Sequence, residues 1–455
     1  MTEHIFLTDE DTFQKMILFE YAASEANKGN RDFVVHVLRY ITLNELKTTL
    51  LKLSGLYRPG VTARKLFRKI GIPTRIHWVM PKALPIKIRK RIQDIDFFHA
   101  GYGSTIYPHV VEILESRNIE INSSKRLILK YLRIAINTGG TLKSLAMKSD
   151  SRITTVNGRW VKNKSIVDHF QGRGFAVKIV DSGAYLGTWD IWNSSQSISE
   201  ARQKMIESWN NVHDESDGHQ AKISIARSYL EGRRNFDPHA GVNWTERMTA
   251  FELPNEVGDK KICVFYSSTQ LEFVGIGDPD IPGDFQNQGE ALDALLKLLD
   301  PDQWIVILRM HPISPRKQRV SDEGDIWDSA LKHRHLIVVP PASPVNSYFL
   351  AENATLAVHY NSSIGAELIY KGSIPVITVG PSVLQALDVP VATNVTSLRK
   401  ILENPISIPS PDTVLPFGYF YATHGNKFQH IQQENGAGWI IDGKNLSARK
   451  RWMPS

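Results

Sequence analysis

Cysteines and long apolar runs are scarce in this sequence. Its 455 residues include one cysteine, Cys263, which lies in the apolar run Ile262–Tyr266. A lone cysteine cannot form an internal disulfide, and a thiol in such a run is more readily a buried, inert side chain than a nucleophile. No uninterrupted apolar run approaches the ~20 residues of a membrane-spanning helix. The first residues are acidic where a signal peptide requires basic ones, so we expect a cytoplasmic protein.

The sequence also lacks internal repeats and low-complexity tracts. Hydrophobic residues make up 42% of the chain and charged residues 22%, as in a folded globular protein. A chain of 455 residues is too long for one ordinary hydrophobic core. We expect an N-terminal domain at 1–255, a C-terminal domain at 256–412, and a helical segment at 413–455 that returns to the N-terminal domain.

The net charge of +7 is distributed unevenly, because basic residues crowd the N-terminal third. They are Arg64, Lys65, Arg68, Lys69, Lys82, Lys87, Arg89, Lys90, Arg91, Lys125, Arg126, Lys130 and Arg133. Zinc-finger spacing, an aromatic RNA-binding motif and a helix-turn-helix are all missing, so nucleic acid is not the expected partner. An anionic inner-membrane surface or an anionic glycan suits this face better. A solvated face without a special role remains the alternative.

The stretch at 354–380 has the pattern of one strand–helix–strand unit. Its expected elements are the strand Thr355–Tyr360, the helix Ile364–Tyr370 and the strand Ile374–Val379. Asn361, Ser362 and Ser363 offer N-cap side chains at the first turn. Gly372 suits the left-handed residue that ends a helix. Because a helix start presents unpaired N–H groups and a positive dipole end, the pattern predicts either a phosphate-binding seat or a helix that the serines merely cap.

The chain before this stretch alternates strands with helices, which predicts a parallel Rossmann-like sheet. The expected strands are Lys261–Tyr266, Trp304–Arg309 and Leu336–Val339, with helices at Gln288–Leu299 and Val345–Ala351. Polar side chains follow three of the strands. They are Ser267 and Ser268, then His311, then Ser362 and Ser363. Because the carboxyl ends of parallel strands meet at one edge of the sheet, we expect a ligand-binding crevice there.

A second unit of this kind lies in the N-terminal domain. The expected elements are the strand Thr154–Val156, the helix Ser165–Gln171 and the strand Ala176–Val180. The turn Asn157-Gly158-Arg159 follows the first strand, and Asp181 ends the second. These polar residues are therefore candidates for a site on the N-terminal domain.

The C-terminal motifs together resemble a known family. His311-Pro312 ends one strand, and Ser362-Ser363 starts a helix that carries Glu367 four residues after Ser363. Gly-x-x-Pro-Val follows from Gly372. This order resembles the donor-binding half of GT-B glycosyltransferases, and in particular the bacterial capsule polysaccharide biosynthesis group with its Kdo transferases. Bacterial sialyltransferases, which bind a CMP-sugar, share the His-Pro and Ser-Ser pattern.

Further motifs agree with the capsule group over roughly residues 150–435. They are Asn157-Gly158-Arg159, the pair Ser267-Ser268 with Gln288 downstream, and Tyr421-x-x-His424-Gly425. One motif departs from the group, because Asp181-Ser182-Gly183 stands where the family tends to have Glu-x-Gly. The resemblance implies two Rossmann-like domains whose parallel sheets face a central cleft.

The resemblance assigns donor-binding roles to six residues. Ser362 and Ser363 would stabilise the leaving phosphate, His311 would donate to phosphate or ribose oxygens, and Glu367 would accept from ribose hydroxyls. Ser267 and Ser268 would contact phosphate or sugar. Each role has an alternative. Ser362 and Ser363 would only cap the helix, His311 would be structural, and Glu367 would be solvated. Ser267 and Ser268 would only form turns.

No metal or cofactor is expected, because helix-start donors serve the leaving phosphate and the nucleotide-sugar is itself a substrate. Two sequences match the metal-binding pattern Asp-x-Asp: Asp94-Ile95-Asp96 and Asp278-Pro279-Asp280. We interpret both as surface or loop carboxylates.

The acceptor hydroxyl needs a general base, which the N-terminal domain would supply. Asp181 is the first candidate, and Asp96 is the second, with Asp94 and His99 as further alternatives. Asn157 and Arg159 are acceptor-side candidates. Arg159 would either steer an anionic acceptor or form an ion pair with Asp181.

We therefore expect a cytoplasmic, metal-independent GT-B glycosyltransferase, peripheral to the inner membrane if the basic face binds lipid. It would transfer a sugar from a nucleotide donor, CMP-Kdo or a related keto-sugar, to a surface polysaccharide or its lipid-linked precursor. The alternatives are a teichoic-acid-type polyol-phosphate polymerase and a transferase using UDP-, GDP- or dTDP-sugars. A sugar-nucleotide 2-epimerase, a non-catalytic glycan-binding protein and a nucleic-acid binder also remain open.

Overall fold

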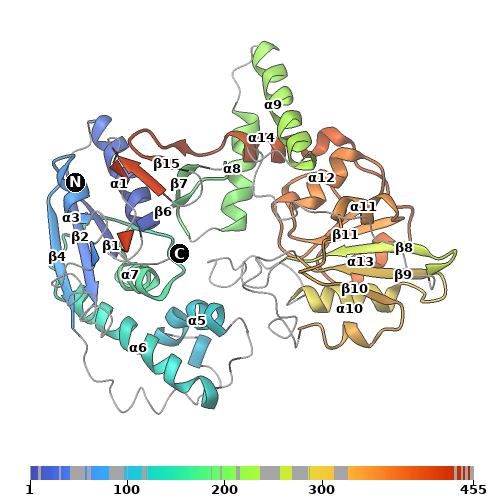
Figure 1. Cartoon of the computed structure of the whole chain (residues 1–455), viewed down its shortest axis with the longest axis horizontal. Coiled ribbons are helices and arrows are strands. Elements are labelled where there is room, and N and C mark those ends of the chain that lie inside the picture. The colour runs from blue at the N-terminus through green and yellow to red at the C-terminus, as the bar shows by residue number, and fades with distance from the viewer. Residues whose placement is uncertain are drawn as a thin grey trace. The chain divides into compact units, whose positions relative to one another are not determined.

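The computed structural model of the chain divides into two compact units (Figure 1). Unit 1 comprises Met1–Gly183, Gly187–Gln196 and Gly425–Ser455, and unit 2 comprises Ala184–Leu186 and Ser197–His424. The described residues are 2–8, 12–29, 32–40, 57–58, 63–80, 97–99, 101–114, 119, 121–185, 187–194, 197–211, 216–235, 257–268, 285, 287–311, 326–434, 438–441, 444–445 and 449–450.

Unit 1 is built on a seven-stranded sheet with the order β14-β7-β6-β5-β1-β2-β4. The strands are β1 (Glu3–Thr8), β2 (Phe33–Tyr40), β4 (Thr74–Val79), β5 (Arg152–Val156), β6 (Val177–Ser182), β7 (Thr188–Trp192) and β14 (Asn426–Lys427). From β6 to β4 all neighbouring strands are parallel, whereas β7 and β14 are antiparallel additions at one edge. The strand order reverses between β1 and β5, because the chain builds β2 and β4 on one side of β1 and β5 and β6 on the other.

The helices of unit 1 connect and cover these strands. They are α1 (Thr12–Asn27), α3 (Ala63–Arg68), η1 (Phe97–His99), α5 (Gly101–Leu114), α6 (Ile121–Lys143) and α7 (Val161–Gln171). The short strands β3 (Tyr57–Arg58) and β18 (Arg449–Lys450) pair with each other, and β15 (Gln432–Glu434), β16 (Gly438–Ile441) and β17 (Lys444–Asn445) form a small sheet.

Three histidines form a hydrogen-bonded chain across neighbouring strands of unit 1. His4 Nδ1 lies 2.9 Å from His36 Nε2, and His36 Nδ1 lies 2.9 Å from His77 Nε2. His36 is buried and its ring also stacks on Phe6. Burial, followed by the neighbouring His77, His4 and Arg75, lowers the pKa of His36 to about 3. His36 is therefore a neutral imidazole, with one ring nitrogen donating and the other accepting.

Unit 2 contains a fully parallel six-stranded sheet with the order β10-β9-β8-β11-β12-β13. The strands are β8 (Lys261–Tyr266), β9 (Trp304–Arg309), β10 (Leu336–Val339), β11 (Leu356–Tyr360), β12 (Val376–Val379) and β13 (Val391–Ala392). This is the strand order of a doubly wound Rossmann sheet, and it reverses between β8 and β11. The predicted fold class, two Rossmann-like units with parallel sheets, is confirmed, and it is consistent with a GT-B fold.

The helices of unit 2 are of two kinds. Those that connect or directly follow the strands are α10 (Gln288–Leu298), η8 (Ala330–Lys332), α11 (Ser347–Glu352), α12 (Ile364–Lys371), η9 (Val383–Ala386) and α13 (Val395–Leu402). Figure 1 shows α10 on one face of the sheet and α11 and α12 on the other. The remaining helices are α8 (Ile198–Asn210), α9 (Ser216–Arg234), η10 (Pro411–Val414) and α14 (Leu415–Thr423). No helix among the described residues is both long and apolar enough to cross a membrane.

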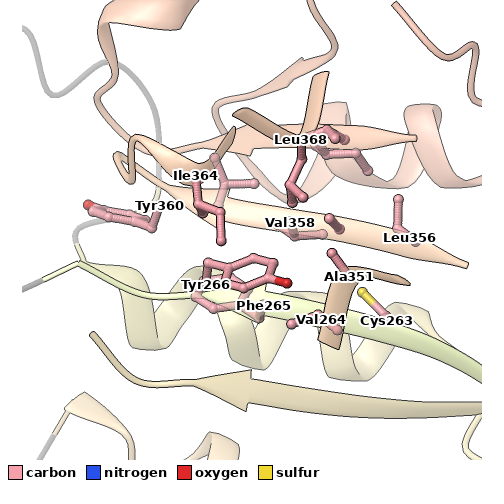
Figure 2. Packing of buried hydrophobic residues seen from close by; sticks show 14 of the residues in the cluster. Cys263, Val264, Phe265, Tyr266, Ala351, Leu356, Val358, Tyr360, Ile364 and Leu368 are labelled. Carbon is pink, nitrogen blue, oxygen red and sulfur yellow. The ribbon is translucent and has the colours of Figure 1, made fainter. Parts of the chain in front are cut away.

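The core of unit 2 lies where β8 and β11 pair. Figure 2 shows apolar side chains from both strands packing with Ala351 of α11 and with Ile364 and Leu368 of α12. Cys263 is fully buried in this core, as the sequence predicted, and burial raises the pKa of its thiol. Gly372 has a φ of 64° and donates its N–H to the Leu368 and Ile369 carbonyls, so it ends α12 in the left-handed conformation expected.

The division into units differs from the sequence-based boundary at 255/256, because α8 and α9 belong to unit 2. Both helices pack against α14. The contact between α9 and α14 is close at Gly418, where a Cβ atom would lie 2.7 Å from the Ala226 carbonyl oxygen. A glycine therefore lets the two helix backbones approach each other.

The C-terminal segment also differs from the prediction of a helical return at 413–455. Its helix α14 stays in unit 2, and the chain re-enters unit 1 at Gly425 as strand β14. Buried Glu20 of α1 fixes the segment that follows, because its carboxylate accepts from the backbone N–H of Gln429 at 2.5 Å and of His430 at 3.1 Å.

We predict that unit 1 loses stability as the pH falls from about 6.5 toward about 3, the unfolded and folded pKa values of His36. Between these values the unfolded state binds more protons, so stability falls by up to about 1.4 kcal/mol per pH unit for this histidine. Hydrogen exchange of the β2 amides at several pH values, corrected for intrinsic exchange, measures the slope. The variant His36→Phe should flatten it, whereas replacing exposed His219 of α9 with Phe should not. An equal slope in the His36 variant would contradict the prediction.

Candidate functional site

The candidate site of unit 2 lies at the carboxyl ends of β8, β9 and β11. Ser267 Oγ accepts from the backbone N–H of His311 at 2.9 Å, which ties the end of β8 to the end of β9. Ser268 Oγ donates to the Asn361 carbonyl at 3.1 Å, which ties β8 to β11. The structure thus brings together the three polar strand ends that the sequence singled out, at the point where the strand order reverses.

The two serines after β8 hold neighbouring parts of the site together. Ser267 and Ser268 are buried, and Ser268 is held by a pair of bonds to the side chain of Gln288. The Ser268 N–H donates to Gln288 Oε1 at 2.9 Å, and Gln288 Nε2 donates to the Ser268 carbonyl at 2.7 Å. Both hydroxyls serve intramolecular bonds, so in this conformation they shape the edge of the site.

The turn after β11 is oriented by a histidine that sequence reasoning missed. His359 is fully buried, and its Nδ1 accepts from the Ser362 N–H at 3.3 Å while its Nε2 lies 2.9 Å from Thr378 Oγ1. Burial lowers the pKa of His359 to about 4, which keeps the imidazole neutral and Nδ1 able to accept. Asn361 next to it has a φ of 48°, in the left-handed region that asparagine tolerates better than most residues. The only feature of the sequence that could have indicated this role was the presence of His359 within an apolar run.

Ser363 occupies the N-cap position of α12, but its side chain makes no capping hydrogen bond. The residue is exposed. Its Oγ instead accepts from Arg233 Nη2 at 3.1 Å. The alternative that the Ser363 side chain merely caps the helix therefore does not describe this structure, and a cation lies at the start of α12.

Arg233 is the principal residue that sequence reasoning missed. It lies near the end of α9, and its Nε donates to Glu367 Oε1 at 3.0 Å. Tyr348 donates its hydroxyl to the other carboxylate oxygen of Glu367. Burial is the largest single influence on the pKa of Arg233 and lowers it, but Glu367, Tyr229 and Tyr348 together raise it further, so the net pKa is raised and the side chain stays charged.

This arrangement changes the interpretation of Glu367. Its side chain is 3% exposed, and both of its oxygens accept from Arg233 or Tyr348. The contacts indicate that Glu367 holds Arg233 against the helix start, which differs from the predicted contact with ribose hydroxyls.

A second cation lies under the same edge of the sheet. Arg309, the last residue of β9, is buried and donates to the Pro340 carbonyl at 2.9 Å, to Ser347 Oγ at 3.3 Å and to the Ser343 carbonyl at 3.4 Å. Burial lowers its pKa to about 10, so it is still charged at neutral pH. None of these partners is a carboxylate, and its positive charge therefore adds to that of Arg233 and of the α12 dipole.

The structure also brings together two of the candidates in unit 1. Asn157 Nδ2 donates to Asp181 Oδ2 at 3.0 Å, and Asp181 is 3% exposed. Asn157 and Gly158 have φ values of 62° and 71°, which turn the chain sharply after β5. The guanidinium of Arg159 lies over the Trp160 ring, 5.5 Å from its centroid.

Several candidates cannot be placed in this way. Asp94, Asp96, Pro312, Asp278 and Asp280 lie outside the described residues, as do the basic residues Lys82, Lys87, Arg89, Lys90 and Arg91. Within the described part of the chain, His, Cys, Asp and Glu side chains form no group of three or more that could hold a metal ion.

Comparison with known proteins gives matches among solved structures. No protein-family model matches the chain, and no curated protein matches its sequence. A putative UDP-N-acetylglucosamine 2-epimerase from Listeria monocytogenes is 9% identical over 94% of this chain and 93% of its own, with a TM-score of 0.25. The α,α-trehalose 6-phosphate synthase of Burkholderia multivorans is 10% identical over 93% and 95%, with a TM-score of 0.31. Because these identities and TM-scores are low, the fold is described from the strand order and pairing of this chain's own sheets.

We predict that Gly365→Ala disrupts the turn after β11. A Cβ atom at Gly365 would lie 2.3 Å from His359 Nε2, so the ring that orients Ser362 must move. Crowding of this kind costs about 1–3 kcal/mol of stability. Urea unfolding measures the loss. The control Gly140→Ala lies in α6 with nothing within 4 Å of the new Cβ, and should be neutral or stabilising. Equal stability of the two variants would contradict this account of the turn.

Proposed function

We propose that this chain is a glycosyltransferase that binds the phosphates of a nucleotide-sugar at the start of α12. The observation that carries the proposal is the hydrogen bond from Arg233 Nη2 to Ser363 Oγ, at the reversal of strand order in unit 2. Ligands of open α/β sheets bind at such reversals, and phosphates bind where a helix begins.

The charges around this point suit the departure of a nucleotide. Breaking the bond between the sugar and its phosphate leaves negative charge on the phosphate oxygens, which fixed positive groups stabilise. Arg233 is held in position by Glu367, and Arg309 contributes from beneath the sheet. Protein groups can thus perform the role that a divalent cation has in other transferases, and we propose a metal-independent reaction.

The donor and acceptor follow from the resemblance stated above. We propose CMP-Kdo or a related CMP-keto-sugar as donor, and a bacterial surface polysaccharide or its lipid-linked precursor as acceptor. Asp181 is proposed as the base that takes the acceptor's proton, with Asn157 orienting its carboxylate. The basic residues of the N-terminal third would favour an acceptor at an anionic membrane surface.

Calorimetric titration with CMP, UDP, GDP and dTDP in the presence of EDTA tests the proposal. We expect CMP to bind most tightly, without any added metal. UDP is essential in the panel because several of the solved structures that match this chain are complexes with UDP or UDP-sugars. A preference for another nucleotide would replace the CMP-sugar donor, and binding of none would overturn the proposal. Recovery of binding on adding magnesium or manganese would contradict metal independence.

We predict that removing the Arg233 charge weakens nucleotide binding by about 10- to 100-fold, the value of a hydrogen bond to a charged group. The double variant Arg233→Gln, Glu367→Gln avoids leaving a buried carboxylate without its cation. Affinity for CMP should fall, whereas the weaker affinity for cytidine should not change.

Arg227→Gln is the matched control, because Arg227 lies on the same helix and pairs with Asp412 on the surface. Its effect on affinity should be negligible. Equal affinities of the double variant and the control for CMP would exclude Arg233 from the phosphate site.

A further inference from the structure

Unit 1 contains a cavity that the proposed function does not use. Its volume is about 530 Å³, and it lies among α5, α6 and α7, which pack against one another (Figure 1). Pockets for small ligands generally have ~300–1,000 Å³. The lining residues come from the start of α5, from α6 and α7, and from the residues that follow α7.

The cavity is lined by different residues from the candidate acceptor site. Its α7 side extends from Ser165 to Arg173, which follows the helix. Asn157, Arg159 and Asp181 do not line it. The cavity is therefore distinct from the Asn157 and Asp181 cluster.

Small side chains on α6 create the space. Ala135, Gly139 and Lys143 are spaced four residues apart and so share one face of the helix, and all three line the cavity. A Cβ atom at Gly139 would lie 3.5 Å from the hydroxyl oxygen of Tyr102, an ordinary contact. The Tyr102 ring also lines the cavity, so one wall offers an apolar and aromatic surface.

The charges at the cavity are predominantly positive. Arg173 and Lys143 are exposed, and both lie close enough to His169 to lower its pKa, after burial, which is the largest cause. Asp168 is the one acidic residue among the lining residues, and it already accepts from Lys164 Nζ at 3.0 Å and from Thr105 Oγ1 at 2.6 Å. Cations commonly follow the last turn of a helix, so charge alone would not indicate a ligand.

The histidine supplies the second observation. His169 lines the cavity, and its Nε2 is buried with no hydrogen-bond partner among the described residues. A buried polar atom that lacks a partner costs about 1–3 kcal/mol, and a small rotation of the imidazole that turns Nε2 toward a ligand in the cavity would recover that cost.

We propose that this cavity binds a small organic anion. Its phosphate or carboxylate group would pair with Lys143 and Arg173, its ring would lie against Tyr102 and Gly139, and a polar atom would bond to His169 Nε2. The site is independent of the nucleotide site, because every lining residue belongs to unit 1 and the nucleotide site belongs to unit 2.

Ligand-observed NMR titration of the full chain with phenyl phosphate, benzoate and inorganic phosphate tests the proposal. We expect saturable binding of phenyl phosphate, benzoate or both, and the stronger of the two identifies the anionic group. The double variant Lys143→Gln, Arg173→Gln should weaken binding by about 10- to 100-fold. Gly139→Leu should abolish binding by filling the cavity.

Arg133→Gln is the matched control, since Arg133 is exposed on the same helix and does not line the cavity. It should bind like the unmodified chain. Thermal unfolding of each variant separates loss of the site from loss of the fold, and the charge variants test the site even if Gly139→Leu does not fold. CMP titration of the same variants should be unchanged, so this proposal and the nucleotide proposal fail independently. Binding of neither organic probe, equal binding of inorganic phosphate, or equal loss in the control would overturn the inference.

Discussion

The parallel pairing of β8 with β11 is the contact on which the candidate site of unit 2 depends. The next strand after β8 is β9 on one side and the next strand after β11 is β12 on the other, so the strand order reverses at this pair, where open α/β sheets bind ligands. The strands are joined by backbone pairing from Leu356 and Cys263 to His359 and Tyr266, within a core that excludes water. The hydrogen bond from Ser268 Oγ to the Asn361 carbonyl continues this connection beyond the sheet. Displacement of either strand would therefore disturb the turn residues that follow β8 and β11.

The ion pair of Arg233 with Glu367 adds charge to that framework. A buried carboxylate is costly unless it is paired and hydrogen-bonded, and Glu367 receives both a guanidinium and a tyrosine hydroxyl. The ion pair is thus expected to contribute little to folding stability, because the attraction between the two charges is offset by the cost of removing both from water. The pair instead holds the Arg233 guanidinium in place. A guanidinium that is fixed before a ligand arrives loses little further conformational entropy on binding. This arrangement requires α9 to fold with unit 2, and the close contact of α9 with α14 at Gly418 meets that requirement.

The sequence was most informative where structure is local. Alternating strands and helices, the polar strand ends and the left-handed Gly372 all depend on residues within a few positions of one another, and the structure has them as expected. Arg233 could not be assigned in this way, because 130 residues separate it from Ser363, and only tertiary folding brings the two together. The altered role of Glu367 has the same origin. The contact-based division places α8 and α9 with unit 2 through their packing on α14, and such packing between distant segments cannot be read from local sequence patterns.

The two units have a similar strand topology but carry different charges at the carboxyl ends of their strands. Both sheets reverse their strand order, between β1 and β5 in unit 1 and between β8 and β11 in unit 2. In unit 1 the carboxyl end of β6 carries a buried carboxylate, Asp181, which accepts from the Asn157 amide and from the Ser182 N–H. In unit 2 the corresponding edge carries the cations Arg233 and Arg309. Hydrogen bonds from neutral groups orient the Asp181 carboxylate, whereas the fixed cations of unit 2 favour the binding of an anion. Under the proposed function, these two arrangements would meet opposite electrostatic demands, the acceptance of a proton in unit 1 and the departure of an anion in unit 2.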